Sequence, residues 1–184
     1  GSEMCIRDRS QCLQRELSEL IPLPETKLKS GTVLVVGLGN RGVTPDSLGP
    51  RVAERVFVTR HIKEHMPEAF DFDIPSVCAI APGVLGVTGV ETMDIVFGVA
   101  NKVKPDLIIA VDALASRRAA RISTTIQLSD SGISPGSGVG NTRADLSRAN
   151  LGVPVIAVGV PLVVYASTIS QLSLIHISEP TRRS

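Results

Sequence analysis

The chain has 184 residues, of which 43% are hydrophobic and 20% are charged, and its formal net charge is +1. A chain of this length and hydrophobic content is sufficient for one globular domain with a hydrophobic core, and it is too short for a second full domain. The 19 basic and 18 acidic residues form no long run of one sign, which argues against nucleic-acid binding and against a membrane-surface patch. No run of about 18 apolar residues and no secretory signal pattern occur, so we expect a cytoplasmic protein.

The two ends of the chain differ in pattern from the middle. Residues 1–10 and 172–184 do not continue the neighbouring periodicities, and both resemble translated adapter sequence. We expect them to be non-native tails around a single α/β domain over residues 11–171. A match of the underlying nucleotides to genomic DNA would contradict this expectation.

Between the ends, short apolar runs alternate with helical patterns. Parallel strands buried on both faces are predicted at residues 33–36, 77–80, 107–111 and 153–160, and a more polar strand is predicted at 123–128. A helix near residues 52–57 places Val52, Ala53, Val56 and Phe57 on one face. A second helix is predicted to begin with a capping box formed by Thr88 and Glu91, and to end at Lys104 and Pro105. The alternation predicts an α/β fold, an open and mostly parallel sheet with helices on both faces.

Two aspartates follow predicted strands and are expected at the same edge of this sheet. Asp46 lies in the segment GLGNRGVTPDSLGP after the first strand, and Asp112 ends the apolar run LIIAVD. Chemistry in open α/β sheets gathers beyond the carboxyl ends of the strands. Asp46 also suits a turn or a helix start, whereas Asp112 in an apolar strand costs several kcal/mol unless it is hydrogen-bonded, paired or functional. The pair is therefore the candidate catalytic site.

Five sequence blocks in order resemble the motifs of the germination protease family. They are VLVVGLGNRGVTPDSLGPRV, APGVLGVTGVET, VDALASR, GISPGSGVGNTR and GVPVIAVGVPLVV, and they cover about residues 32–168. The family usually has an acidic residue where this chain has Tyr165, and it continues with a further C-terminal region, so the resemblance implies a catalytic domain that is incomplete at its C-terminus.

The resemblance also implies a function and a fold. It implies an aspartic-type endopeptidase that degrades small acid-soluble spore proteins during germination, made as a zymogen, assembled as a homotetramer and active in the spore core. The implied fold is related to the three-layer fold of hydrogenase maturation proteases. By motif match, the catalytic residues are Asp46 and Asp112. No metal, no cofactor, no direct nucleic-acid partner and no membrane contact are expected.

Two other motifs allow rival functions. GLGNRG, residues 37–42, is a literal G-x-G-x-x-G after a strand, which is the dinucleotide-binding pattern when a helix begins inside it. Here Pro45, Gly49 and Pro50 postpone the helix to about Pro50, which argues against a dinucleotide oxidoreductase. HIKEH, residues 61–65, matches the H-x-x-E-H of inverted zinc peptidases, but it is followed by Pro67 and has no clear third ligand. A solvated helix end is therefore the favoured interpretation.

A glycine-rich loop and a basic cluster complete the candidate site. The loop GISPGSGVGNT, residues 132–142, has flexible backbone and exposed amides that suit substrate binding, and it suits a plain connection equally well. Arg117, with Arg118 and Arg121, suits either an acidic substrate or a solvated turn. The candidate substrate-binding residues are Gly136, Ser137, Gly138, Asn141 and Arg117.

Two functions besides the paired-aspartate endopeptidase stay open. The first is a nickel-recognising peptidase of the hydrogenase maturation type, which would draw on imidazole as well as carboxylate ligands. The second is an inactive fragment or a binding domain. A spore protein cleavage assay with and without chelator separates the three.

Overall fold

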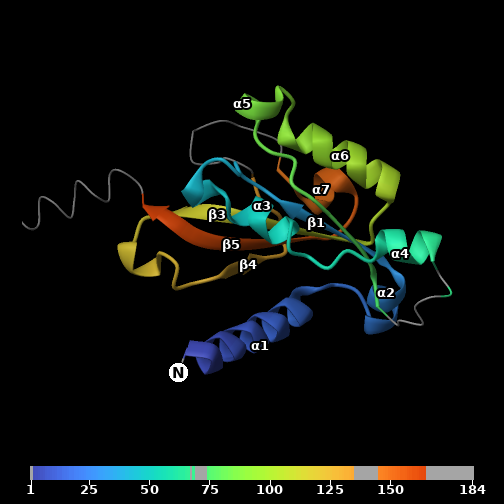
Figure 1. Ribbon diagram of the computed structural model, residues 1–184, viewed down its shortest axis with the longest axis horizontal. Helices are drawn as coiled ribbons and strands as arrows, with labels where there is room; N and C mark the ends of the chain where they lie inside the picture. Colours follow the sequence, from blue (N-terminus) through green and yellow to red (C-terminus); the bar gives the residue numbers. More distant parts are fainter. Residues whose placement is uncertain (1, 67, 69–73, 135–144, 165–184) are drawn as a thin grey trace, which may run out of the picture.

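The computed structural model describes residues 2–66, 68, 74–134 and 145–164 (Figure 1). The helices are α1 (Ser2–Leu20), α2 (Glu25–Ser30), α3 (Leu48–Ala53), α4 (Arg60–His65), α5 (Leu85–Thr88), α6 (Thr92–Val103) and α7 (Arg148–Leu151), with 3₁₀ turns η1 (Thr44–Asp46) and η3 (Ala119–Arg121). The strands are β1 (Thr32–Gly37), β2 (Ser76–Ile80), β3 (Leu107–Ser116), β4 (Gln127–Ser129) and β5 (Val155–Val164).

The strands form one sheet of five, in the order β2-β1-β3-β5-β4. The four strands predicted from apolar runs pair in parallel, and β4 alone runs antiparallel, at the edge beside β5. The α/β fold with a mostly parallel sheet is confirmed. Because parallel strands point the same way, the carboxyl ends of β1, β3 and β5 lie at one rim of the sheet.

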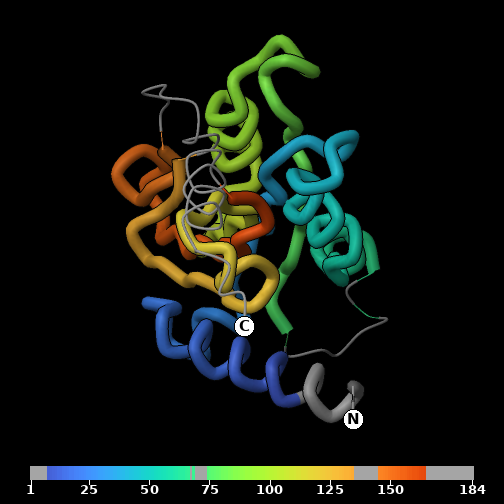
Figure 2. The backbone as a smooth tube through the Cα atoms, turned by 90° about the vertical axis from the view of Figure 1, so that its left-hand side faces the viewer, coloured from blue at the N-terminus to red at the C-terminus, as the bar shows by residue number. Residues whose placement is uncertain are grey.

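Helices cover the two faces of the sheet, which makes three layers (Figure 2). Alternate residues of β1 face opposite sides: Leu34 and Val36 pack in a cluster with Val96 and Ala100 of α6. Val33 and Val35 pack in a second cluster, against which Leu17, Leu20 and Leu28 of the first two helices and Val56 are placed. Both faces of β1 are therefore buried, which explains its continuous apolar sequence. Among the described residues, no helix has the length and apolar character of a membrane span.

The predicted capping box at Thr88 and Glu91 is wrong. Glu91 is the N-cap of α6 and makes no side-chain capping bond, so the helix begins at Thr92. The Thr88 hydroxyl donates instead toward the carbonyls of Val84 and Val90, at 3.2 and 3.0 Å, and Gly89 ends the short helix α5 in the left-handed conformation. The end of α6 at Lys104 is confirmed.

Two further boundaries differ from the sequence prediction. The helix predicted near residues 52–57 is α3, which runs from Leu48 to Ala53, and the Phe57 side chain beyond it is 73% exposed. The polar strand predicted at 123–128 begins only at Gln127, because residues 119–121 form η3 and Ser123 follows with a positive φ of 56°. The boundary predicted at residues 10 and 11 falls inside α1 and stays a prediction.

Candidate active site

The site begins where β1 and β3 approach their carboxyl ends. Gly37 pairs with Val111 in the sheet, and the Leu38 amide donates to the Val111 carbonyl at 2.8 Å. The pairing of the two strands therefore continues one residue past β1. This fixes the start of the loop 38–47 directly beside Asp112, the next residue along β3.

Asp112 has a buried side chain at the sheet rim. Its exposed fraction is only 7%, and its Oδ1 accepts a hydrogen bond from the Ala113 amide at 2.8 Å. Burial raises the pKa of the Asp112 carboxyl to about 7; the Ala113 hydrogen bond opposes this rise, and the negative charge of Asp46 adds to it. A carboxyl with this pKa is partly protonated at neutral pH, so it is able to donate as well as accept a proton.

Asp46 reaches the same rim from the loop after β1. It is the last residue of η1 and is half-buried, and its Oδ2 accepts a hydrogen bond from the Asn40 amide at 2.6 Å. The effect of its charge on the pKa of Asp112 shows that the two carboxyl groups interact electrostatically. The structure thus brings together the two aspartates that the sequence singled out.

Close backbone packing keeps the loop against the strands. Gly49, in the first turn of α3, lies so near β1 that a Cβ atom there would be 2.1 Å from the Leu38 carbonyl oxygen. The hydroxyl of Ser47 donates to the Thr44 carbonyl at 2.8 Å and accepts from Arg51 at 3.1 Å. A side chain at position 49 would push α3 away from the sheet, and η1 with it.

The other predicted site residues are the five candidates for substrate binding. Gly136, Ser137, Gly138 and Asn141 lie outside the described residues. Arg117 is exposed and follows the end of β3, five residues past Asp112, which is roughly 16 Å along an extended strand. Their roles stay predictions.

The rival motifs lie in different surroundings. No helix begins inside GLGNRG, because η1 and then α3 follow at Thr44 and Leu48, so helix amides do not cradle a phosphate beside Gly39. His61 and His65 lie on α4, which packs beside the start of β2, where the Thr59 amide donates to the Val77 carbonyl at 2.9 Å. Within the described ranges, no group of three or more His, Cys, Asp or Glu side chains is placed to hold a metal ion.

A cavity of about 390 Å³ lies elsewhere, between α1 and the chain that leads into β4. Cys12, Leu13, Ile126 and Val160 are among its lining residues, and neither aspartate is one of them. The aspartate pair is therefore a feature of the sheet rim and not of this cavity.

Sequence reasoning missed the residues that hold Asp46. Gly39 has a φ of +114°, and a Cβ atom at this position would lie 2.2 Å from the Asp46 carbonyl oxygen. Asn40 supplies the amide that binds the Asp46 carboxylate. Both belong to GLGNRG, which matches a dinucleotide-binding pattern and is also part of the first block that resembles the germination protease family. The sequence signal that could have pointed to these two residues is the glycine-rich turn directly after a buried strand.

Comparison with known proteins places the chain among named relatives. It is 55% identical over 166 residues to the germination protease of Clostridium acetobutylicum, covering 90% of this chain and 50% of the relative. It is 58% identical over 161 residues to that of Caldanaerobacter subterraneus subsp. tengcongensis, covering 88% and 48%. The chain spans about half the length of the curated relatives it matches.

The solved structures found to be similar to this chain include a hydrogenase maturation protease. It is the [NiFe] hydrogenase maturation protease HycI from Thermococcus kodakarensis, with a TM-score of 0.44 and 18% identity, covering 83% of this chain and 94% of that one. The sequence model of the family described as germination protease matches residues 6–179. This match spans both aspartates and all five strands, and the chain belongs to the germination protease family.

Proposed function

We propose that this chain carries the catalytic region of a spore germination endopeptidase in which Asp46 and Asp112 activate water. The observation that supports the proposal best is the buried carboxyl of Asp112, whose pKa is raised to about 7 beside the charge of Asp46. Buried carboxyl groups with strongly perturbed pKa values cluster at functional sites. Membership of the germination protease family agrees with peptide-bond hydrolysis.

The environments of the two carboxyl groups suit different roles. Asp112 is desolvated and stays partly protonated near neutral pH, so in its protonated form it is the acid that donates to the carbonyl oxygen of the scissile peptide. Asp46 is half-buried, hydrogen-bonded to a backbone amide and negatively charged, so it is the base that takes a proton from water. Paired titratable groups whose surroundings separate their pKa values commonly divide acid and base work in this way.

The proton transfers balance over the whole reaction. Water attacks the carbonyl carbon while its proton passes to Asp46 and the proton of Asp112 passes to the carbonyl oxygen. The tetrahedral intermediate then collapses: Asp46 gives its proton to the leaving amine, and a hydroxyl proton of the intermediate returns to Asp112. The C–N bond breaks and both carboxyl groups regain their starting states, so this step consumes only water.

Small acid-soluble spore proteins are the proposed substrates, and a homotetramer is the proposed assembly. Both rest on the family resemblance, as do zymogen control and action in the spore core. Residues 135–142 of the glycine-rich loop, which is a proposed part of the substrate site, lie outside the described residues.

The decisive experiment compares Asp46→Asn, Asp112→Asn and the double variant in cleavage of a purified small acid-soluble spore protein. Asparagine keeps the shape and most hydrogen bonds but removes the proton exchange. A positioned acid or base contributes about 10²- to 10⁴-fold in rate, so each single change should reduce kcat by at least about 10²-fold. Because the pair works as a unit, the double variant should be little worse than either single one.

Asp130→Asn is the matched control, because Asp130 is exposed at the end of β4 and should tolerate the same chemical change. The same substitutions are made at the positions aligned with Asp46 and Asp112 in the full-length Clostridium acetobutylicum relative, of which this chain covers 50%. Near-parental cleavage by folded Asp112→Asn in the full-length protein would end the paired-aspartate proposal.

A further inference from the structure

Asn40 makes three hydrogen bonds at the turn that it begins: two close the turn, and the third reaches Asp46. The Asn40 side-chain Oδ1 accepts from the Gly42 amide at 2.9 Å, and its carbonyl accepts from the Val43 amide at 3.1 Å. Its own amide donates to Oδ2 of Asp46 at 2.6 Å. The side chain of Asn40 therefore restrains the same short turn from which the amide reaches the carboxylate.

Asp46 is held from the other side by the same loop. Its amide donates to the Val43 carbonyl at 2.9 Å, and Gly39 lies so close that a Cβ atom there would be 2.9 Å from Oδ1. The orientation of the carboxylate thus depends on residues 39–43 keeping one conformation. An Asx turn of this kind is a common way for asparagine to fix its local backbone.

We infer that Asn40 is a positioning residue for the paired aspartates: its side chain closes the 40–43 turn so that its backbone amide holds Asp46 beside Asp112. This inference rests on the proposed function, because it concerns the aim of the base in that mechanism. Asn40 acts through Asp46 and is not itself placed against the reacting atoms.

The proposed role of Asn40 depends on how precisely the Asp46 carboxylate is oriented. A hydrogen bond to an ionised acceptor is stronger and more directional than one between neutral groups, but here its donor belongs to a loop that only a few bonds restrain. Without the Asn40 side chain the amide stays in the chain, but the turn keeps only the bond from the Val43 amide to the Asn40 carbonyl, so the direction of the Asn40 amide is less restrained. Catalytic groups must be held within about 0.5 Å and 10–20° of their working geometry, so a loosened turn costs rate without removing any catalytic group.

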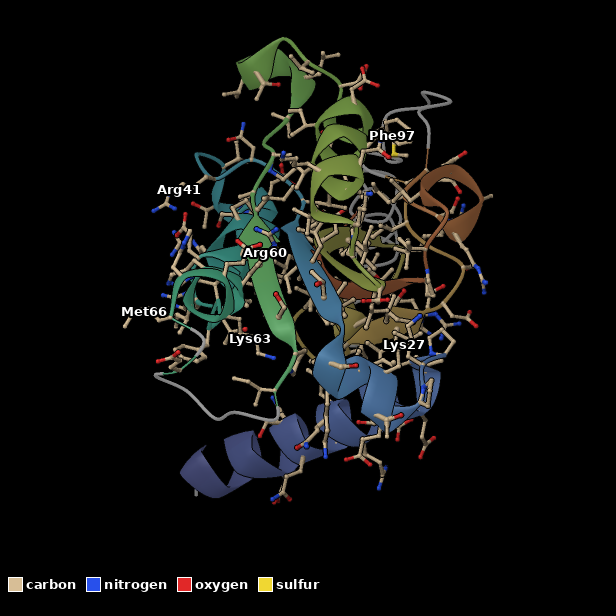
Figure 3. All side chains as sticks on the ribbon, turned by 90° about the vertical axis from the view of Figure 1, so that its right-hand side faces the viewer. Lys27, Arg41, Arg60, Lys63, Met66 and Phe97 are labelled. Carbon is tan, nitrogen blue, oxygen red and sulfur yellow. The ribbon has the colours of Figure 1, made fainter. Side chains whose placement is uncertain are left out.

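The test uses three substitutions at Asn40 and one control in the same loop. Asn40→Ala removes the acceptor for the Gly42 amide, and Asn40→Gln keeps polarity but is too long to close the same turn. Asn40→Ser restores a short acceptor that is able to close it. Arg41→Ala is the control: Arg41 points outward (Figure 3) and pairs with Glu54, so its loss changes the loop surface without touching these bonds.

Two readouts separate positioning from a merely structural role. The first is cleavage: we expect kcat to fall about 10-fold in Asn40→Ala and Asn40→Gln with KM unchanged, and Asn40→Ser to recover part of it. The second needs no activity: ¹³C-detected titration of the Asp112 carboxyl. The charge of Asp46 raises the pKa of Asp112, so Asp46→Asn should lower that pKa, and a displaced Asp46 in Asn40→Ala should lower it in the same direction by less.

The outcomes distinguish this inference from the proposed function. Parental kcat and a parental Asp112 titration in both Asn40→Ala and Asn40→Gln would overturn the positioning role, whatever happens at the aspartates. A loss of kcat in Arg41→Ala equal to that in the Asn40 variants would overturn it as well, since the effect would then belong to the loop in general. Near-parental cleavage by Asp46→Asn would instead overturn the proposed function. If Asn40→Ala fails to fold, the comparison of kcat and of the Asp112 titration between Asn40→Gln and Asn40→Ser decides.

Discussion

At the scale of single residues, the most informative feature is a carboxyl group whose burial favours its proton. Asp112 ends the apolar run LIIAVD and lies within β3. The sequence alone indicated that a carboxylate there has to be hydrogen-bonded, paired or functional. The structure supplies one partner, the Ala113 amide, and one neighbouring charge, Asp46. The single hydrogen bond from the Ala113 amide does not offset the loss of solvent around the carboxyl group, so the pKa of Asp112 stays raised. The group therefore links protein stability to pH as well as serving the proposed chemistry.

We predict that Asp112 makes the protein less stable as pH rises from about 4 to 7. An unfolded aspartate titrates near 3.9, whereas the folded group titrates at about 7; between these values only the folded state keeps the proton. The free energy of unfolding therefore falls with rising pH, by at most about 4 kcal/mol for this group. The Asp112→Asn variant lacks this dependence.

Urea denaturation of the parent and of Asp112→Asn at pH 5 and pH 8 measures this difference. We expect the variant to gain stability relative to the parent between the two pH values, because the other titrating groups are shared and cancel. Parallel stability profiles would show that the folded-state pKa of Asp112 is not raised.

At the scale of elements, the strands could be predicted and the loops could not. Each buried parallel strand reads as a continuous apolar run, since both of its faces are covered. The edge strand β4 is polar and only three residues long, so its sequence carried a weak signal and the prediction began four residues early. Helix α3 begins two residues before Pro50 because Gly49 packs directly on β1, which is a tertiary contact invisible to local periodicity.

The candidate site was likewise predictable in part: the two aspartates could be found from the sequence, and the contacts that orient them could not. The two aspartates could be found because strand ends meet at one rim, and this depends only on strand order. The hydrogen bonds that orient Asp46 depend on the φ of Gly39 and on the Asn40 amide. Backbone geometry of this kind leaves no pattern in side-chain types beyond the glycines themselves. The GLGNRG motif is therefore visible in the sequence, where the late helix start argues against a dinucleotide site, but its part in holding Asp46 is not.

We predict that Gly39→Ala destabilises the loop and displaces Asp46. The residue has a φ of +114°, and the added Cβ atom would lie 2.2 Å from the Asp46 carbonyl oxygen, so the backbone must move. Strain of this kind costs about 1 to 3 kcal/mol, and thermal or urea unfolding should show it. Cleavage should fall by more than the unfolded fraction explains, since the shifted backbone is that of Asp46 itself.

Gly98→Ala is the matched control for this substitution. Gly98 lies within α6 with an exposed position, and no atom comes within 4 Å of an added Cβ atom. Alanine is favoured over glycine in a helix interior by about 0.5 to 1 kcal/mol, so this variant should be more stable and should cleave as the parent does. A stable, fully active Gly39→Ala protein would contradict the geometry of the loop.

At the scale of the whole molecule, the arrangement of the sheet separates the aspartates from the histidines. Asp46 lies on the loop after β1, and Asp112 lies within β3, one residue past the Val111 that pairs with the last residue of β1. Helix α4, with His61 and His65, packs beside the start of β2. Strands in a parallel sheet begin at one rim and end at the other. Residues of the two motifs therefore lie toward opposite rims, and one metal ion is not shared between them in this fold.

The last prediction follows from that separation: cleavage by the full-length protein should survive removal of divalent metal ions. Water activation in the proposed mechanism relies on a carboxylate and not on a bound Lewis acid, and no set of three metal-binding side chains is found among residues 8–66, 68, 74–134 and 145–164. The measurement is the rate of spore protein cleavage before and after dialysis against a strong chelator, with His61→Ala/His65→Ala as a companion variant. We expect both treatments to leave kcat within about twofold of the parent, because neither touches the groups that exchange protons. Loss of activity on chelation, with recovery on adding nickel or zinc, would favour a metal-recognising peptidase, and loss in the histidine variant would identify α4 as its site.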